Sequence, residues 1–378
     1  MSKIFFVSKD ASWQKYRNDI LKAFSIKYNS EIKILTVNGI KDYLSKGEKL
    51  EYKHFFNFCP PRNKLSFFPG AVKYIVKNKP DVVLALNNST QVTEYCALIM
   101  CRLLRIKFVW WTHGYDHYPV IKSKLMEFIK KKYSLFFLNL GNQIITFSDE
   151  GRDYLINQKI SPEKITTAPN TLDTKRLLEL KEKILAKYSI GSIKKELGVK
   201  EQDRIVLFSG RLNKLKRVED AIKSIRIVSD QINNIKFVII GTGSEDKNLR
   251  KLCEDLIPSK FIFVGELFDE ELLSKWFTVA DIFLMPGYVG LAIVHAFCFG
   301  LPIITEKDAF HGPEIQFLED NINGYMVRKG DIEALAEKTI YLLNNNEAKE
   351  KMSKEALSVI SGNASIDNML RQMKKALL

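Results

Sequence analysis

Short apolar runs alternate with longer amphipathic segments in the first half of the chain. The runs short enough for buried strands are 4–7, 32–37, 81–86, 108–111 and 144–148. Apolar residues at helical spacing occupy the segments near 14–28, 70–79, 90–104 and 149–158. This alternation predicts a parallel sheet with helices on both faces, so we expect one Rossmann-like domain. The basic, aromatic stretch 52–68 is assigned to neither a strand nor a helix.

The second half repeats this rhythm. Its predicted strands are 204–208, 237–240, 262–265, 282–285 and 302–305, and its predicted helices include 218–229, 269–279 and 291–299. Residues 174–200 are highly charged and helical, which places the domain junction near residue 190. We expect an α/β protein with two Rossmann-like domains, 1–190 and 191–355, and a C-terminal helix, 356–378, that packs back on the first domain.

Composition adds a charge preference to this picture. The 378 residues are 46% hydrophobic, and 58 Lys and Arg against 44 Asp and Glu give a formal net charge of +14. This favours an anionic partner such as a nucleotide, a nucleic acid or an acidic membrane surface. No recognised nucleic-acid motif accompanies the charge, so we do not expect a nucleic-acid partner.

Five scattered cysteines indicate reduced thiols in a cytoplasmic protein, with no disulfide framework and no zinc or other metal site. The N-terminus resembles a first strand rather than a secretory signal, and no apolar run approaches the ~20 residues needed to cross a bilayer. We expect a cytoplasmic location.

Residues 284–302 carry the strongest local signal. Pro286 and Gly287 end a buried strand, and Gly290 adjoins the start of a predicted helix. Unpaired N–H groups and the helix dipole favour an anion there, and a phosphate would fit. An ordinary glycine turn of a doubly wound sheet is the alternative interpretation.

Two cations follow another predicted strand. Arg211 comes directly after Gly210, and Lys216 is five residues further on. At the carboxyl end of a strand they would bind a pyrophosphate, with the Arg fork contacting two oxygens and the Lys acting as a point charge. Ordinary surface charge in a lysine-rich protein is the alternative.

The segment 112–119 is a loop at a strand's carboxyl end, where open α/β sheets place their ligands. This position makes His113 a candidate catalytic residue, although a lone histidine is more often structural. His117 is a weaker candidate.

Residues 122–132 predict a basic amphipathic helix. Such a helix can lie on anionic lipid, whereas a solvated helix face over the core is the alternative. Phe67 and Phe68 would extend a membrane-facing patch only if they lay on the same side.

Taken in order, several motifs resemble family 4 glycosyltransferases, which are retaining enzymes of the two-domain GT-B fold. The motifs are Gly210-Arg211-Leu212 with Lys216, Gly241-Thr242-Gly243, Phe263-Val264-Gly265, Ala280-Asp281, 286–302, Pro313-Glu314 and Asn323-Gly324. In the first half, Pro162-Glu163-Lys164-Ile165, Pro169-Asn170 and Asp173 are similar to the family's approach to its domain linker. The resemblance is close over about 145–345 and weak before that.

The resemblance implies two parallel-sheet domains facing across a cleft, the first for the acceptor and the second for a nucleotide sugar. Arg211 and Lys216 would hold the donor diphosphate and stabilise charge on the leaving phosphate. The further donor-binding residues it implies are Gly210, Gly241, Gly243, Phe263, Val264, Gly287, Val289, Gly290, Leu291, His295 and Glu314. Family members usually need no metal, and no cofactor is implied beyond the donor itself.

The sequence departs from the family at two positions. Gly287 and His295 stand where the family usually has two glutamates, one near the donor sugar and one near the ribose. A neutral histidine can still bond ribose hydroxyls, whereas glycine offers only backbone. Glu314 is a separate acidic candidate, with a helix-start role as its alternative.

We therefore expect a transferase of polysaccharide biosynthesis that moves a sugar to a glycan or lipid-linked glycan, with an anionic inner membrane surface as a further candidate partner. A non-catalytic sugar-nucleotide-binding or scaffold subunit is the alternative, which the missing glutamates favour. A nucleotide-sugar epimerase fits the motif order less well.

Overall fold

The computed structural model describes residues 1–9, 14–37, 50–59, 66–87, 92–115 and 124–378. The chain forms two compact units, Met1–Asn170 with Ile366–Leu378, and Thr171–Ser365. The junction therefore lies at Asn170 and Thr171, earlier in the chain than the expected position near residue 190. The charged helix that suggested the later boundary belongs to the second unit.

Unit 1 contains a parallel sheet in the order β3-β2-β1-β4-β5-β6-β7. Its strands are β1 (Lys3–Val7), β2 (Glu31–Val37), β3 (Leu50–Phe55), β4 (Val82–Leu86), β5 (Lys107–Thr112), β6 (Gln143–Thr146) and β7 (Ile165–Thr167). Its helices are α1 (Gln14–Tyr28), α2 (Pro69–Asn78), α3 (Val92–Leu103), α4 (Lys124–Leu140), α5 (Asp149–Asn157), the 3-10 turn η1 (Pro162–Lys164) and α14 (Ile366–Leu377).

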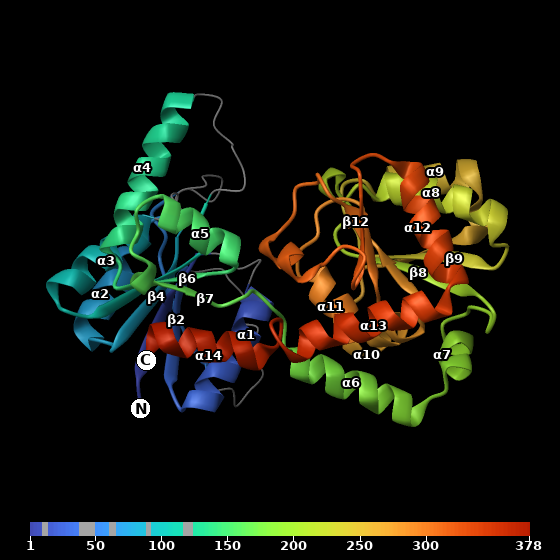
Figure 1. Cartoon of the computed structure of the whole chain (residues 1–378). Helices are drawn as coiled ribbons and strands as arrows, with labels where there is room; N and C mark the ends of the chain where they lie inside the picture. Colours follow the sequence, from blue (N-terminus) through green and yellow to red (C-terminus); the bar gives the residue numbers. More distant parts are fainter. Residues whose placement is uncertain (10–13, 38–49, 60–65, 88–91, 116–123) are drawn as a thin grey trace. The chain divides into compact units, whose positions relative to one another are not determined.

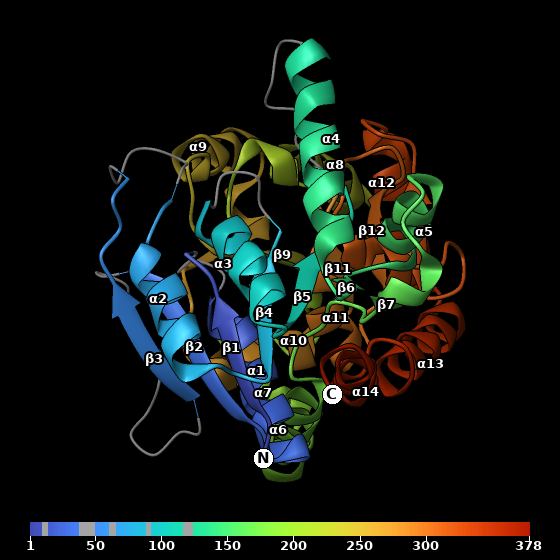
Figure 2. The ribbon, with the colours of Figure 1, turned by 90° about the vertical axis from the view of Figure 1, so that its left-hand side faces the viewer.

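The pleat of these strands explains the two cores of unit 1. Ile4 and Phe6 of β1 pack with α1 and α14, whereas Phe5 and Val7 pack with α2 and α3 on the opposite face. Strands buried on both faces are continuously apolar, as the sequence pattern indicated. Figures 1 and 2 show the sheet between these helical layers.

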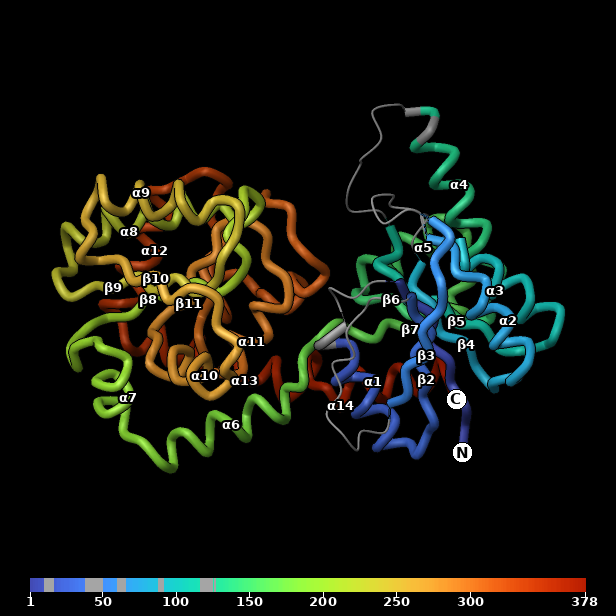
Figure 3. The backbone as a smooth tube through the Cα atoms, turned by 180° about the vertical axis from the view of Figure 1, so that it is seen from behind, coloured from blue at the N-terminus to red at the C-terminus, as the bar shows by residue number. Residues whose placement is uncertain are grey.

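The last helix of the chain completes the first unit. Met369, Leu370 and Met373 of α14 are at most 2% exposed and share a core with β1 and β5. Figure 3 shows this segment in red beside the blue elements of the first unit.

Unit 2 contains a second parallel sheet, in the order β10-β9-β8-β11-β12-β13. Its strands are β8 (Arg204–Ser209), β9 (Ile235–Ile240), β10 (Phe261–Gly265), β11 (Ile282–Leu284), β12 (Ile303–Glu306) and β13 (Gly324–Val327). Its helices are α6 (Thr174–Lys187), α7 (Ile190–Glu196), α8 (Val218–Gln231), α9 (Asp246–Leu256), α10 (Glu270–Val279), α11 (Ala292–Cys298), α12 (Ile332–Asn344) and α13 (Asn346–Ser361), with 3-10 turns η2 (Lys214–Lys216), η3 (Pro258–Lys260) and η4 (Pro313–Phe317).

The predicted pair of Rossmann-like parallel sheets is confirmed, with two local corrections. The stretch 52–68 begins inside strand β3, which the sequence pattern missed because most β3 side chains are half-buried at a sheet edge. The predicted helix 122–132 is α4, which continues to Leu140. No helix in the described residues has the length and apolar content needed to span a membrane.

Candidate functional site

Two glycine loops lie side by side after β8 and β9. The N–H of Gly210 donates to Ile240 O at 2.9 Å, and the N–H of Leu212 donates to Thr242 O at 2.9 Å. A Cβ at Gly241, where φ is +129°, would lie only 2.0 Å from Gly210 O. Only glycine fits such a close backbone approach. The strand order reverses between β8 and β11, so these loops lie at the switch point where doubly wound sheets bind ligands.

A cavity of about 440 Å³ opens over these loops. Its lining residues are Gly210, Arg211, Gly241, Thr242, Gly243 and Glu266. Arg211 is exposed, and its guanidinium forms no hydrogen bond or ion pair with the residues described. Its N–H groups are therefore available to an anion in the cavity.

Lys216 lies next to Gly210. A Cβ at Gly210 would be 3.7 Å from Lys216 Cε, and Lys216 Nζ donates to Tyr288 O at 2.7 Å. Burial lowers the pKa of Lys216 from 10.5 to about 8, although the charge of Glu314 opposes the shift. An anionic ligand would favour the charged form of this ammonium group.

The loop after β11 is fastened to the turn that carries Lys216. The N–H of Gly287 donates to Lys216 O at 3.1 Å, and the N–H of Tyr288 donates to Leu215 O at 2.7 Å. A Cβ at Gly287 would lie 2.1 Å from Leu215 O. This backbone contact brings Lys216 to the glycine loop and leaves no room for a side chain at 287.

Two backbone N–H groups before the first turn of α11 are candidate donors to an anion. Among the described residues, the N–H groups of Gly290 and Leu291 have no partner, whereas the N–H of Val289 donates to His311 Nδ1 at 3.1 Å. Unpaired N–H groups at a helix start favour negative charge. They provide a second group of donors close to Lys216.

His311 and Glu306 support this loop from behind. Because His311 Nδ1 accepts from Val289, its Nε2 carries the proton and donates to Glu306 O at 2.7 Å. The Glu306 side chain is fully buried, accepts from Gly330 N–H at 3.0 Å and lies 2.8 Å from Arg217 Nε. Burial raises the pKa of Glu306, although Arg217 opposes the shift.

Glu314 places a carboxylate beside the same loop. The residue is 3% exposed, and its Oε2 lies 2.5 Å from the position of a Cβ at Gly312 and 3.8 Å from one at Gly290. Its charge also acts on Lys216. The structure therefore gathers Lys216, Gly290 and Glu314 from three separate segments.

Three expected donor-binding residues, His295, Phe263 and Val264, do not line the cavity beside Arg211. His295 stacks on Phe277 of α10 with 4.1 Å between ring centroids, and burial lowers the pKa of His295 to about 4. Its Nε2 is enclosed and has no hydrogen-bond partner in the described residues. Phe263 lies under the Arg250 guanidinium at 4.3 Å, and Val264 is half-buried on the edge strand β10.

His113 belongs to the first unit, directly after β5. Its ring centroid lies 4.5 Å from that of Phe147, and its carbonyl oxygen would be 2.3 Å from a Cβ at Gly151. His113 therefore lies at the carboxyl end of a strand, as expected. His117 lies outside the described residues.

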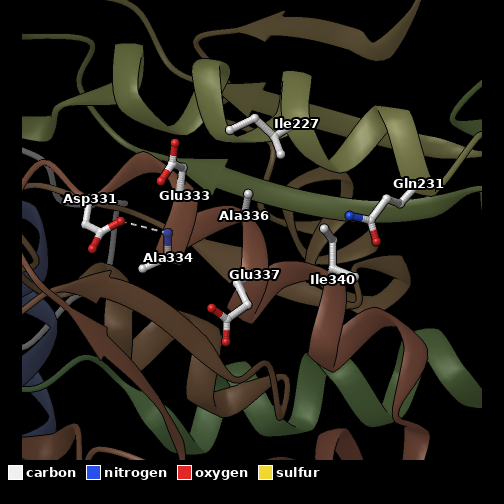
Figure 4. A pocket seen from close by; sticks show the side chains of 8 residues that line it. All are labelled: Ile227, Gln231, Asp331, Glu333, Ala334, Ala336, Glu337 and Ile340. Atoms are coloured by element: carbon white, nitrogen blue, oxygen red, sulfur yellow. Dashed lines mark hydrogen bonds between the residues drawn. The ribbon is translucent and has the colours of Figure 1, made fainter.

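A second cavity, of about 500 Å³, lies between α8 and α12 (Figure 4). Its charged lining residues are Asp331, Glu333 and Glu337, and Asp331 accepts from the N–H of Ala334 at 2.9 Å. Like charge disfavours a phosphate there, so the cavity beside Arg211 is the candidate anion site.

Two family models match the chain. The model described as Glycosyltransferase Family 4 matches residues 31–176, and that described as Glycosyl transferases group 1 matches residues 189–359. Together they cover most of both units. The chain has the GT-B fold, with a glycosyltransferase family match in each half.

Individual relatives of this GT-B chain are distant. The N-acetyl-alpha-D-glucosaminyl L-malate synthase of Bacillus anthracis is 24% identical over 230 residues, which are 57% of this chain and 56% of that protein. The sulfoquinovosyl transferase SQD2 of Arabidopsis thaliana is 23% identical over 309 residues, 79% of this chain and 57% of the relative. The chain thus spans little more than half the length of these relatives.

A solved structure supports the GT-B fold across the whole chain. Anabaena Alr3699/HepE in complex with UDP matches with a TM-score of 0.77 at 16% identity, covering 99% of both chains. At this identity the match supports the architecture rather than the chemistry.

Several residues of this GT-B site carried no sequence signal. His311, Glu306 and Arg217 support the glycine loop through contacts between segments far apart in the chain, which spacing does not reveal. Glu266 lines the cavity and directly follows the Phe263-Val264-Gly265 motif at a strand's carboxyl end, so its position could have indicated it.

Proposed function

We propose that the chain is a retaining, metal-independent glycosyltransferase that moves a sugar from a nucleotide diphosphate sugar to a glycan or a lipid-linked glycan. The observation that carries this proposal is the convergence of Arg211, Lys216 and the N–H groups of Gly290 and Leu291 around the switch point of the second sheet. Retention and metal independence follow from the family resemblance. We place the activity in the cytoplasm, at the inner face of the membrane.

The known complexes of relatives favour this donor class. The Anabaena protein has been solved with UDP and with UDP-glucose. By analogy, a diphosphate would contact the Arg211 fork and the Lys216 ammonium, while the N–H groups at the start of α11 would meet its distal phosphate. Gly210, Gly241 and Gly243 would allow close approach of the backbone.

These groups would act mainly on the leaving diphosphate. Negative charge grows on it as the bond to the sugar breaks, and fixed cations and N–H donors stabilise that charge without reorganisation. The diphosphate oxygen would then accept the proton of the acceptor hydroxyl. We assign His113 to the acceptor side, where its imidazole would accept or donate a hydrogen bond that orients that hydroxyl.

We further propose that sugar recognition differs from the family pattern. The clash between a Cβ at Gly287 and Leu215 O, at 2.1 Å, argues against a carboxylate at this position in the present backbone. Glu314 is the carboxylate beside Gly290, and we assign the donor sugar's hydroxyls to it. Phe263 and Val264 would line the base, whereas His295, stacked on Phe277 with its Nε2 enclosed, would reach the ribose only after its ring turned away from Phe277.

Substitution of the two cations tests the proposal. We expect Arg211→Ala and Lys216→Met each to lower kcat by about 10²- to 10³-fold, since each removes one preorganised charge donor. Transfer would be measured with uridine, guanosine and adenosine diphosphate sugars on lipid-linked glycan acceptors. Lys214→Met is the matched control, because Lys214 is an exposed lysine of the same turn. Unchanged turnover in both test variants would refute this site.

A non-catalytic sugar-nucleotide-binding subunit is the second candidate, and the closed position at Gly287 favours it. Calorimetry separates the two candidates. Donor binding without transfer or hydrolysis, for any acceptor, would support the binding subunit, whereas sugar release dependent on Lys216 would support the enzyme.

A further inference from the structure

Helix α4 carries an apolar face that the described residues leave uncovered. Leu125 is 68% exposed, Phe128 56%, Ile129 50% and Phe136 60%. At 3.6 residues per turn these positions fall on one side of the helix. Large apolar side chains gathered on one exposed face indicate an interaction surface rather than scattered surface residues.

The opposite side of α4 is fixed to the first unit. Trp110 Nε1 donates to Phe137 O at 2.9 Å, Asn87 Nδ2 donates to Ser134 Oγ at 3.0 Å, and Leu138 is 1% exposed. These contacts lie in the second half of the helix. Figures 1 and 2 show its first turns extending beyond the other helices of that unit.

Three consecutive lysines accompany the apolar face. Lys132 lies within it, with Nζ 5.6 Å from the centroid of the Phe128 ring. Lys130 and Lys131 lie outside it on the same turn, and Lys131 Nζ is 5.2 Å from the centroid of the Tyr154 ring of α5. Glu127 is the one acidic residue of α4. Long lysine stems can follow apolar surface while their ammonium groups remain at a polar boundary.

We propose that α4 binds an anionic lipid bilayer, with Leu125, Phe128, Ile129 and Phe136 in the headgroup region and the lysines on acidic headgroups. An exposed apolar face on a lysine-rich helix is typical of helices that lie in the membrane plane. A second copy of the chain is a less favourable partner for this face, because a two-fold contact would bring the lysines of both copies together. The inference deepens the proposed function, since a lipid-linked acceptor would be met at this surface.

Flotation of the full-length chain with vesicles tests the proposal. Vesicles of phosphatidylcholine alone would be compared with equal mixtures of phosphatidylcholine and phosphatidylglycerol. We expect binding to the mixed vesicles, weakened by salt. Phe128→Ser with Ile129→Ser should reduce it about tenfold or more, because two inserted apolar side chains are lost. Lys131→Gln with Lys132→Gln should reduce it about fivefold per lysine.

Matched controls come from the same unit. Leu103→Ser alters a residue that is 72% exposed on α3, and Lys73→Gln with Lys77→Gln removes two exposed lysines of α2. Both controls should bind vesicles like the parent chain. Circular dichroism of every variant would verify folding.

Three outcomes would overturn the proposal: equal binding to neutral and anionic vesicles, α4 variants that bind like the controls, or self-association that the Phe128 and Ile129 changes abolish. The last outcome would identify the face as a contact between copies. Calorimetric donor binding in the same variants keeps the two proposals separate, because loss of vesicle binding with retained donor binding concerns α4 alone.

Discussion

The two units build the same sheet and place different chemistry at its carboxyl edge. The order β3-β2-β1-β4-β5-β6 of the first unit corresponds to β10-β9-β8-β11-β12-β13 of the second. After β5 the first unit places His113 against Phe147, with the Arg17 guanidinium 5.8 Å from the same ring. After β8 and β11 the second unit places glycine loops, Arg211 and Lys216. The apolar strands determine the shared architecture, whereas the loops determine what each unit can bind.

The loops of the second unit also rest on the ion pair between Glu306 and Arg217. Removing it should have the largest effect on the free energy of unfolding. Glu306→Ala in the second unit should lower the free energy of unfolding by about 2–3 kcal/mol, the range of a hydrogen bond to a charged group, because Arg217 is 30% exposed and retains Asp220 at 2.5 Å. Urea unfolding monitored by circular dichroism measures the change. A loss below about 1 kcal/mol, as for an exposed pair, would show that Glu306 does not support the loop.

The next prediction concerns the close backbone contact at Gly287 in the second unit. Gly287→Ala should destabilise the fold by about 1–3 kcal/mol, since its Cβ would overlap Leu215 O. Gly191→Ala is the control, because Gly191 lies on α7 next to the flexible Glu201 side chain. Alanine there should be neutral or stabilising by about 0.5–1 kcal/mol. Equal thermal midpoints for the two variants would contradict this account.

The third prediction concerns Lys216 in the second unit, which should make donor affinity depend on pH. The pKa of Lys216 is lowered to about 8, so the free chain loses this charge as pH rises through that value. A bound diphosphate would raise the pKa again. The Kd should therefore be flat below pH 8 and rise by up to about tenfold per pH unit above it. Calorimetry between pH 7 and 9.5 would measure this, and Lys216→Met should show no such rise.

The smallest effect is expected at the edge of the first sheet. Lys33 of β2 lies 2.7 Å from Glu51 and 3.2 Å from Glu31, and the bond to Glu51 is the main cause of its raised pKa. These carboxylates are partly solvated, so Lys33→Gln should cost no more than about 1 kcal/mol. A loss comparable to that of Glu306→Ala would remove the contrast between the two units.

The sequence predicted the fold wherever apolar periodicity was strong. It located the glycine loops and the two cations because glycine and strand ends are local signals. It missed β3, whose residues Leu50–Phe55 contain no apolar run, and it ended α4 before Leu135 and Phe136. It had no access to the contact between His311 and Val289, which joins positions 22 residues apart through tertiary packing.

The place of α14 in the first unit has a consequence for biosynthesis. Met369, Met373 and Leu377 fill the core beside β1, yet the ribosome makes them only after all of Thr171–Ser365. During translation the first unit therefore remains incomplete, with part of its apolar core exposed, until α14 is made. The second unit can fold before that point. Nascent chains stalled before residue 366 should expose this surface to chaperones.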